Sequence, residues 1–219
     1  MMQEQEKADL ELPQTETKPS EKKYKGEGKS IILGITGASG SIYALRILRM
    51  LMLNNFNINL ILTEYAHFSL YRECGVELKP STIKTLFPDL IIREETVSFH
   101  NNLDLKSNIF SSSGNIYGMI IAPCAVNYIS GIANGSCKNL IEKCADFLLS
   151  HYKPVILVPR ETPVNKIYLR NLIKIIDAGG RIVPAAPSFE FSPKDFNDLA
   201  DYIANKVLEL LELSGSESF

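Results

Sequence analysis

A glycine-rich turn near the start of the chain carries the first chemistry that the sequence suggests. Residues 30–36 are mostly apolar and β-branched, and the run is short enough for a buried strand. The turn Gly37-Ala38-Ser39-Gly40 follows, and from Ser41 the apolar residues recur at the spacing of a helix face. This order leaves backbone N–H groups free at the positive end of a helix, where a phosphate can bind. The alternative is a turn that only lets the strand and the helix pack closely.

Hydroxyl, amide and charged residues follow three further runs that could be buried strands. They come at residues 63–64, 123–128 and 160–163. Ligands of parallel sheets bind beyond the carboxyl ends of the strands, so we expect these segments and the glycine turn to line one crevice. Arg160 and Glu161 are predicted to form a buried pair, which offers a phosphate clamp beside a tunable carboxylate. The alternative for this pair is a structural ion pair in a loop.

Predicted strands and helices alternate along the chain. Such alternation indicates a parallel sheet, so we predict an α/β protein: a single-domain Rossmann-like parallel sheet with helices on both faces. Residues 74–109 are predicted to form loops with minor strands or turns. The predicted strands are 30–36, 57–63, 117–123, 154–159 and 181–184, and the predicted helices are one that begins at 41, 65–73, 139–150, 164–178 and 195–213.

Composition limits the classes of function. The chain of 219 residues suits one domain with a substantial core, and its net charge of −2 does not indicate nucleic-acid binding. No apolar run is long enough to span a membrane. The four cysteines form no C-x-x-C pair, which indicates a reducing compartment and no metal site, so we expect a cytoplasmic protein. Residues 1–29 are rich in Glu, Lys and Gln and predict a disordered tail, which leaves residues 30–213 as the folded domain.

A dinucleotide-binding enzyme is one alternative for the glycine turn. Residues 36–42 also resemble the turn of short-chain dehydrogenases, and Glu64 ends the second strand where a ribose-binding acid would lie. Tyr202 and Lys206 have the spacing of the catalytic pair of those enzymes. This pair, however, lies on the last predicted helix with no strand to follow, and the glycines lack the G-x-G-x-x-G spacing. We therefore expect Tyr202 on a core face and Lys206 exposed.

Five motifs together resemble the UbiX-type flavin prenyltransferases, which belong to the flavoprotein cysteine-decarboxylase-like superfamily. The resemblance covers about residues 30–213. Arg-Glu-Thr-Pro at 160–163 separates the chain from the decarboxylase branch, which carries a catalytic His before its central strand. Residues 108–114, the corresponding segment here, contain no His. The other four motifs lie at residues 34–43, 122–127, 130–136 and 184–189.

The resemblance implies a domain that binds FMN and joins a dimethylallyl group from dimethylallyl phosphate to reduced FMN. The product, prenylated FMN, would serve a partner decarboxylase of the UbiD type, and the family usually forms homododecamers without a metal. The resemblance also implies that Glu161 is the acid/base and that Ser39 lies near the reacting flavin edge. The implied cofactor contacts are Gly37, Ala38, Ser39, Thr63, Ala125, Asn127, Tyr128 and Arg160, and the implied substrate-phosphate positions are Arg160, Lys206 and Glu190.

Several positions depart from the family pattern. Residues 125–128 read Ala-Val-Asn-Tyr where the family has Ser-x-Lys-Thr, which removes a hydroxyl and a charge beside the flavin. In the phosphate pocket, Ser150 replaces a Lys, Glu190 a Tyr and Lys206 an Arg. A carboxylate added to an anion site weakens it by about 2 kcal/mol. The chain also has no Trp to wall a prenyl pocket. A non-catalytic FMN-binding or carrier protein therefore stays open as an alternative, and so does an NAD(P)-dependent oxidoreductase.

The histidines and one cysteine near the predicted crevice favour structural roles. His67 is expected to cap or pack, and Cys124 to be a small core residue. His100 and His151 are expected to face the solvent.

Overall fold

Six parallel strands form one sheet, in a computed structural model that describes residues 26–92, 96–112 and 116–213. The strands are β1 (Ser30–Ile35), β2 (Asn57–Leu62), β3 (Val97–Asn101), β4 (Ile116–Cys124), β5 (Val155–Pro159) and β6 (Arg181–Ile182). Their order across the sheet is β3-β2-β1-β4-β5-β6. This is the strand order of the doubly wound Rossmann fold, so the predicted fold class is confirmed.

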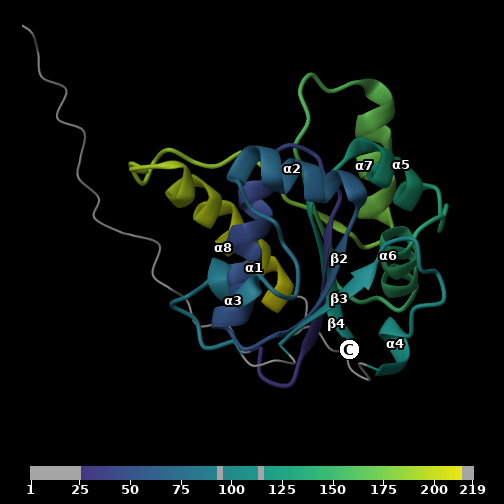
Figure 1. The fold of residues 1–219 in the computed structure, drawn as a ribbon. Helices are drawn as coiled ribbons and strands as arrows, with labels where there is room; N and C mark the ends of the chain where they lie inside the picture. The colour runs from purple at the N-terminus through teal and green to yellow at the C-terminus, as the bar shows by residue number, and fades with distance from the viewer. Residues whose placement is uncertain (1–25, 93–95, 113–115, 214–219) are drawn as a thin grey trace, which may run out of the picture.

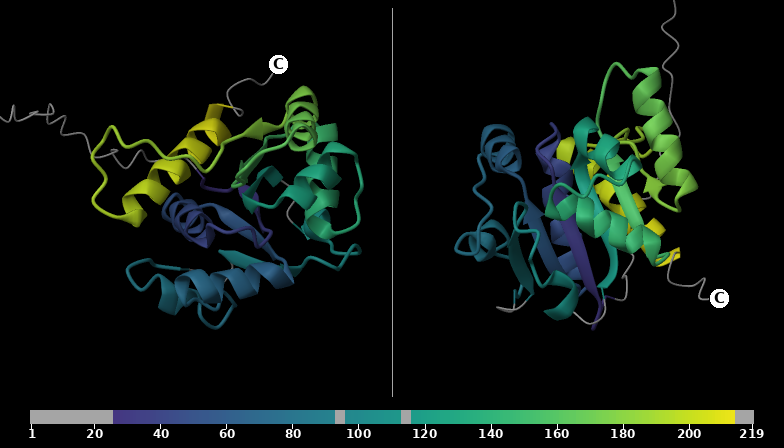
Figure 2. Two further views of the ribbon diagram at one scale, coloured as in Figure 1. Left: turned by 90° about the horizontal axis from the view of Figure 1, so that it is seen from above. Right: turned by 90° about the vertical axis from the view of Figure 1, so that its right-hand side faces the viewer.

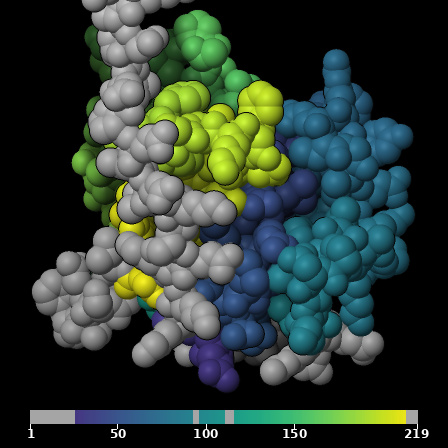
Figure 3. All heavy atoms as spheres, turned by 90° about the vertical axis from the view of Figure 1, so that its left-hand side faces the viewer, coloured from purple at the N-terminus to yellow at the C-terminus, as the bar shows by residue number. Residues whose placement is uncertain are grey.

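Helices cover both faces of the sheet (Figures 1 and 2). The helices α1 (Ser41–Leu53), α2 (Glu64–Cys74) and α8 (Phe196–Leu213) lie in one layer. Together with the short helix α3 (Ile83–Leu86), they contribute side chains to one hydrophobic core. The start of α8 lies beside α1 on the face shown in Figure 3. The helices α5 (Val126–Ala133), α6 (Leu140–Ser150) and α7 (Lys166–Asp177) lie in the opposite layer. Together with the short helix α4 (Ile109–Ser112), they contribute side chains to a second hydrophobic core.

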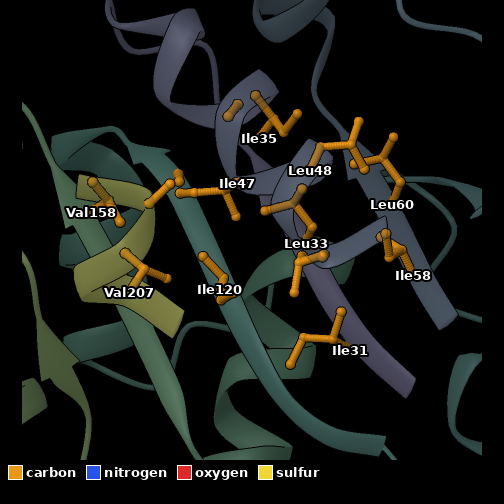
Figure 4. Packing of buried hydrophobic residues seen from close by; sticks show 14 of the residues in the cluster. Ile31, Leu33, Ile35, Ile47, Leu48, Ile58, Leu60, Ile120, Val158 and Val207 are labelled. Carbon is orange, nitrogen blue, oxygen red and sulfur yellow. The ribbon is translucent and has the colours of Figure 1, made fainter. Parts of the chain in front are cut away.

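Strand β1 is buried on both faces in the middle of the sheet. Ile31, Leu33 and Ile35 point toward α1, where Ile47 lies among them (Figure 4). Ile32 points the other way, into the core beneath α5 and α6. Burial on both faces explains why β1 is a continuous apolar run rather than an alternating one.

Four elements were not placed from the sequence: β3, α5 and the one-turn helices α3 and α4. Residues 97–101 lie in the segment predicted as loops with minor strands or turns, but they form β3, which pairs with β2 along its full length. As an edge strand, β3 is only partly buried, so it lacks the apolar run that marks the inner strands. Helix α5 was missed because it is two turns long and contains Gly131, a poor helix former. The predicted strands and helices are confirmed, with bounds that differ by at most two residues.

The described chain begins four residues before the predicted domain boundary at residue 30. The Gly26 N–H donates to the Asn54 carbonyl at 3.0 Å, and Gly26 packs on the Phe56 ring. The rest of the predicted tail, residues 1–25, lies outside the described residues. None of the helices in the described part of the chain has the length and apolar character that a membrane span requires.

His100 does not face the solvent as predicted. It lies on β3, half-buried, with Nε2 3.0 Å from the Asn59 Oδ1 atom on β2. Burial lowers the pKa of His100, and the charge of Asp104 opposes this only in part. His151 is exposed as predicted and stacks on the Phe147 ring.

The segment Ser130–Ser136, one of the family motifs, holds α5 against α6. The Glu142 carboxylate of α6 is buried and accepts hydrogen bonds from the Ser136 hydroxyl at 2.5 Å and from the Lys138 N–H at 2.9 Å. A Cβ atom on Gly131 would lie 2.3 Å from Glu142 Oε1. Glycine at position 131 therefore makes room for this carboxylate, and the position of α5 depends on it.

Replacement of Gly131 by Ala should lower the free energy of unfolding by about 1–3 kcal/mol, because the methyl group overpacks against a buried carboxylate. Urea denaturation would measure the loss. Ser130→Ala, one residue earlier on the same helix, is the control and should change stability by less than about 0.5 kcal/mol. Equal stability of Gly131→Ala and the wild type would contradict this role of Gly131.

Candidate functional site

The Thr36 hydroxyl ties the ends of β1 and β4 together. Its Oγ1 donates to the Pro123 carbonyl at 2.7 Å and accepts from the Ala125 N–H at 2.8 Å. Thr36 is almost fully buried. The glycine turn after β1 therefore lies directly beside the segment after β4, as predicted.

The start of α2 closes the other side of the glycine turn. Gly37 has a φ of 82°, and a Cβ atom there would lie 2.5 Å from the Tyr65 backbone carbon. The Ser69 hydroxyl donates to the Gly37 carbonyl at 2.9 Å. Thr63 is buried and caps α2, because its Oγ1 accepts from the Ala66 N–H at 3.0 Å. Only glycine fits position 37, both for its positive φ and for this close approach.

Arg160 lies across the turn from the side of β5. Its Nε donates to the Ser39 carbonyl at 2.8 Å. Glu161 is exposed beside it and accepts from the Thr162 N–H at 3.1 Å. The predicted buried Arg160–Glu161 pair is wrong: both side chains are exposed and form no ion pair with each other, because β5 ends at Pro159 and both lie beyond the sheet.

Glu73 is a residue of this site that the sequence did not reveal. Its Oε2 accepts from the Gly40 N–H at 2.9 Å and from the Ser41 N–H at 2.8 Å, so the N-terminus of α1 is already occupied. This corrects the expectation of free N–H groups at that helix end. Partial burial raises the pKa of the Glu73 carboxyl, but the N–H groups of Ser41 and Gly40 and the hydroxyls of Ser41 and Ser39 lower it further, to below its ordinary value.

Main-chain donors without an acceptor remain on both sides of the crevice. Among the described residues, the structure gives no acceptor to the N–H groups of Gly37, Ala38 and Ser39. The same holds for Val126 and Asn127 in the first turn of α5, whose N-cap residue Ala125 offers no side-chain cap. Converging N–H groups suit a phosphate and the carbonyl oxygens of a flavin ring. The predicted contacts Gly37, Ala38, Ser39 and Asn127 therefore fit FMN.

Tyr128 and Ala125, two other predicted cofactor contacts, form hydrogen bonds within the fold. The Tyr128 ring is buried in the core beneath α5, and its hydroxyl accepts from Asn102 Nδ2 at 3.1 Å. The Tyr128 side chain therefore points into the core and not toward the predicted cofactor site. Ala125 uses its N–H to bind Thr36 and presents only a half-buried methyl group.

The predicted substrate-phosphate pocket is not assembled within one chain. Lys206 pairs with Glu209 on the same helix, at 3.0 Å, and Glu190 is exposed in the segment before α8. Ser150 is the last residue of α6 and lies near the amino ends of the strands. Arg160 follows the carboxyl end of β5, so the two residues lie at opposite ends of the strands. Within the ranges that the structure describes, no hydrogen bond or ion pair joins these residues to Arg160.

The residues of the dinucleotide alternative do not form a site. The Glu73 carboxylate occupies the helix end that a pyrophosphate would use. Tyr202 stacks on Phe191 beside the core, and Lys206 is exposed, as expected. His67 is exposed on α2. Cys124 is buried as predicted, and burial strongly raises the pKa of its thiol. The part of the chain described here contains no group of three or more acidic, His or Cys residues that could hold a metal ion.

Replacement of Glu73 by Gln should destabilise the protein at neutral pH, because the charged hydrogen bonds to the Gly40 and Ser41 N–H groups are lost. The expected loss is only about 1 kcal/mol, because the carboxylate is exposed enough for solvent to screen these bonds. The native pKa of Glu73 lies below 4.5, so the carboxylate stabilises the native state at higher pH. This advantage over the Gln variant should fade as the pH falls below 4.5. Urea denaturation from pH 3 to 7 would measure it, with Glu27→Gln, an exposed residue before β1, as the control. A stability difference that does not depend on pH would rule out this role.

Comparisons with known proteins agree with this geometry. A family model described as Flavoprotein matches residues 19–208. Flavin prenyltransferase UbiX of Halalkalibacterium halodurans is 37% identical over 180 residues, which cover 82% of this chain and 86% of that protein. A crystal structure of AnUbiX (PadA1) with FMN and dimethylallyl pyrophosphate superposes with a TM-score of 0.74 at 28% identity, covering 87% of this chain and 96% of that one.

A dodecameric FMN-dependent UbiX-like decarboxylase from Escherichia coli O157:H7 is also similar. Its TM-score is 0.72 at 26% identity, and the match covers 84% of this chain and 94% of that one. The matched regions include the glycine turn, the segment after β4 and Arg160, the three parts of the crevice. The chain therefore belongs to the Flavoprotein family, and within it to the group of flavin prenyltransferases named UbiX.

Proposed function

We propose that this protein is a flavin prenyltransferase, which transfers a dimethylallyl group to reduced FMN and so makes prenylated FMN. The observation that carries the proposal is a set of main-chain N–H groups without an acceptor, at residues 37–39 and 126–127 of two neighbouring segments in the described chain, with Arg160 bonded to the first of these segments. A related structure holds FMN and dimethylallyl pyrophosphate together, which supports both ligands here. The donor is dimethylallyl phosphate, or its diphosphate.

The residues of this chain divide the work between binding and proton transfer. The N–H groups of residues 37–39 and of Asn127, with Thr63 behind them, would hold FMN. The two terminal nitrogens of Arg160 stay available for a phosphate, because only its Nε is bonded to Ser39. Reduced FMN supplies the N5 and C6 positions that take up the allyl group. Glu161, exposed at the end of β5, would take or give the proton that this transfer moves, and the Ser39 hydroxyl would lie at the flavin edge.

Assembly and partners follow from the same proposal. Ser150, Glu190 and Lys206 lie apart from Arg160, so a phosphate pocket that includes these positions requires a neighbouring copy of the chain. A related protein is dodecameric, and a large homo-oligomer is the proposed assembly. The product would pass to a UbiD-type decarboxylase, in the cytoplasm.

A carrier of FMN without transferase activity is the second candidate. It is favoured by the charges in the predicted phosphate pocket, where Glu190 adds a carboxylate and Lys206 is already paired with Glu209. Both candidates use the same FMN crevice. They differ in whether the bound FMN is changed.

Replacement of Glu161 by Gln should leave FMN affinity and folding unchanged and lower the rate of prenyl transfer by about 100-fold or more, because Gln keeps the shape but cannot exchange a proton. The rate is measured with reduced FMN and dimethylallyl phosphate, and the product by mass. Glu64→Gln, an exposed carboxylate at the start of α2, is the control. Equal turnover of wild type and Glu161→Gln would refute the role of Glu161. Wild-type protein that binds FMN and never alters it would favour the carrier.

Restoring the family residues in the phosphate pocket tests whether its charges limit the donor. The double variant Ser150→Lys and Glu190→Tyr removes one carboxylate and adds one cation, so the KM for dimethylallyl phosphate should fall by roughly tenfold or more. FMN affinity should not change. Ser150→Gln with Glu190→Gln is the control for changes of size, and a KM equal to that of the wild type in the Lys/Tyr variant would place the pocket elsewhere.

A further inference from the structure

Tyr43 packs against the glycine turn on the side that Arg160 crosses. It lies in the first turn of α1, half-buried, and its N–H donates to the Gly40 carbonyl at 3.0 Å. A Cβ atom on Gly40 would lie 2.9 Å from Tyr43 Cδ2 and 3.0 Å from Cε2. The edge of the phenol ring therefore rests directly on the backbone of Gly40.

The Arg160 side chain shares this contact. The same Cβ position on Gly40 is 3.6 Å from Arg160 Cδ, so the ring of Tyr43 and the methylene groups of Arg160 border the same space beside one glycine. The Arg160 Nε donates to the Ser39 carbonyl at 2.8 Å. This bond occupies Nε and leaves the terminal guanidinium nitrogens for a ligand.

The charge of Arg160 also reaches the phenol of Tyr43. Burial raises the pKa of Tyr43, and the positive charge of Arg160 opposes this rise. The two side chains are therefore neighbours by packing and by electrostatics, although an exposed arginine carries many rotamers in the absence of such support.

We propose that Tyr43 is a positioning residue for Arg160: its ring holds the arginine side chain flat over Gly40, with the terminal nitrogens directed at the anion in the crevice. The inference rests on the proposed function, in which Arg160 contacts a phosphate group. The ring does this work and the hydroxyl is not needed. Gly40 is required because any side chain at this position would separate the ring from the arginine.

A double-mutant cycle tests the proposal on the full chain. The variants are Tyr43→Leu, Tyr43→Phe, Arg160→Lys and the double variant Tyr43→Leu with Arg160→Lys. Lysine at 160 keeps the charge but lacks the planar fork in which Nε bonds the Ser39 carbonyl while the terminal nitrogens bond a phosphate. Two dissociation constants are measured: that of FMN by fluorescence quenching, and that of dimethylallyl phosphate on the FMN-loaded protein by calorimetry. Thermal melting verifies that each variant is folded, and Tyr117→Leu, a half-buried tyrosine at the amino end of β4, is the control for loss of a ring.

For the anion that Arg160→Lys weakens, Tyr43→Leu should weaken binding about tenfold, Tyr43→Phe less than about twofold, and the double variant no more than Arg160→Lys alone. Tyr117→Leu should bind both ligands as the wild type does. Additive losses in the double variant would overturn the inference and leave the role of Arg160 intact. Unchanged affinities in Arg160→Lys would instead remove Arg160 from the proposed site, and the inference with it. A loss in Tyr43→Phe as large as that in Tyr43→Leu would assign the effect to the hydroxyl and overturn the proposed role of the ring.

Discussion

The crevice depends on one buried hydroxyl group. Thr36 both donates to the strand that ends beside it and accepts from the residue that follows that strand. A hydroxyl can do both at once, which neither a methyl group nor an ammonium group could do in its place. These two hydrogen bonds fix the glycine turn and the start of α5 next to each other. The main-chain donors of both segments that have no acceptor in the described chain are neighbours for this reason, as the proposed FMN site requires.

Two side chains of opposite charge, Glu73 and Arg160, bond part of the backbone of the glycine turn and leave the rest for a ligand. The Glu73 carboxylate takes the N–H groups of Gly40 and Ser41, and the Arg160 guanidinium takes the Ser39 carbonyl. What remains is a short set of N–H groups with nothing to bond in the described chain. The helix dipole of α1 is therefore satisfied internally, and the anion site is made by the turn rather than by the helix end.

The sequence predicts the parts of this protein whose signals are local. Buried strands are apolar runs, and the residues at their ends lie side by side as predicted: Thr63 bonds the end of β1, Thr36 the end of β4, and Arg160 the glycine turn. Glu73 could not be recognised in this way, because its partners lie more than thirty residues earlier and nothing in its own helix indicates them. Tyr128 likewise follows a strand end, but its ring is buried in the core, where its hydroxyl accepts a hydrogen bond from Asn102 in the turn after β3. The end of β5 at Pro159 was predicted correctly, but residue types alone do not show that the Arg160 and Glu161 side chains extend into solvent beyond it.

The two halves of the proposed site differ in how far they tolerate substitution. The FMN half is made of main-chain groups, whose positions depend on the fold and on glycines at 37 and 40. Changes of side chain at 125 and 128 leave those donors in place. The phosphate half is made of side chains on exposed surfaces, at Ser150, Glu190 and Lys206, which the core does not need. Substitution there costs little stability and acts on the affinity for an anion. The departures from the family pattern in this half therefore bear on the second substrate, while the fold and the flavin crevice are built without it.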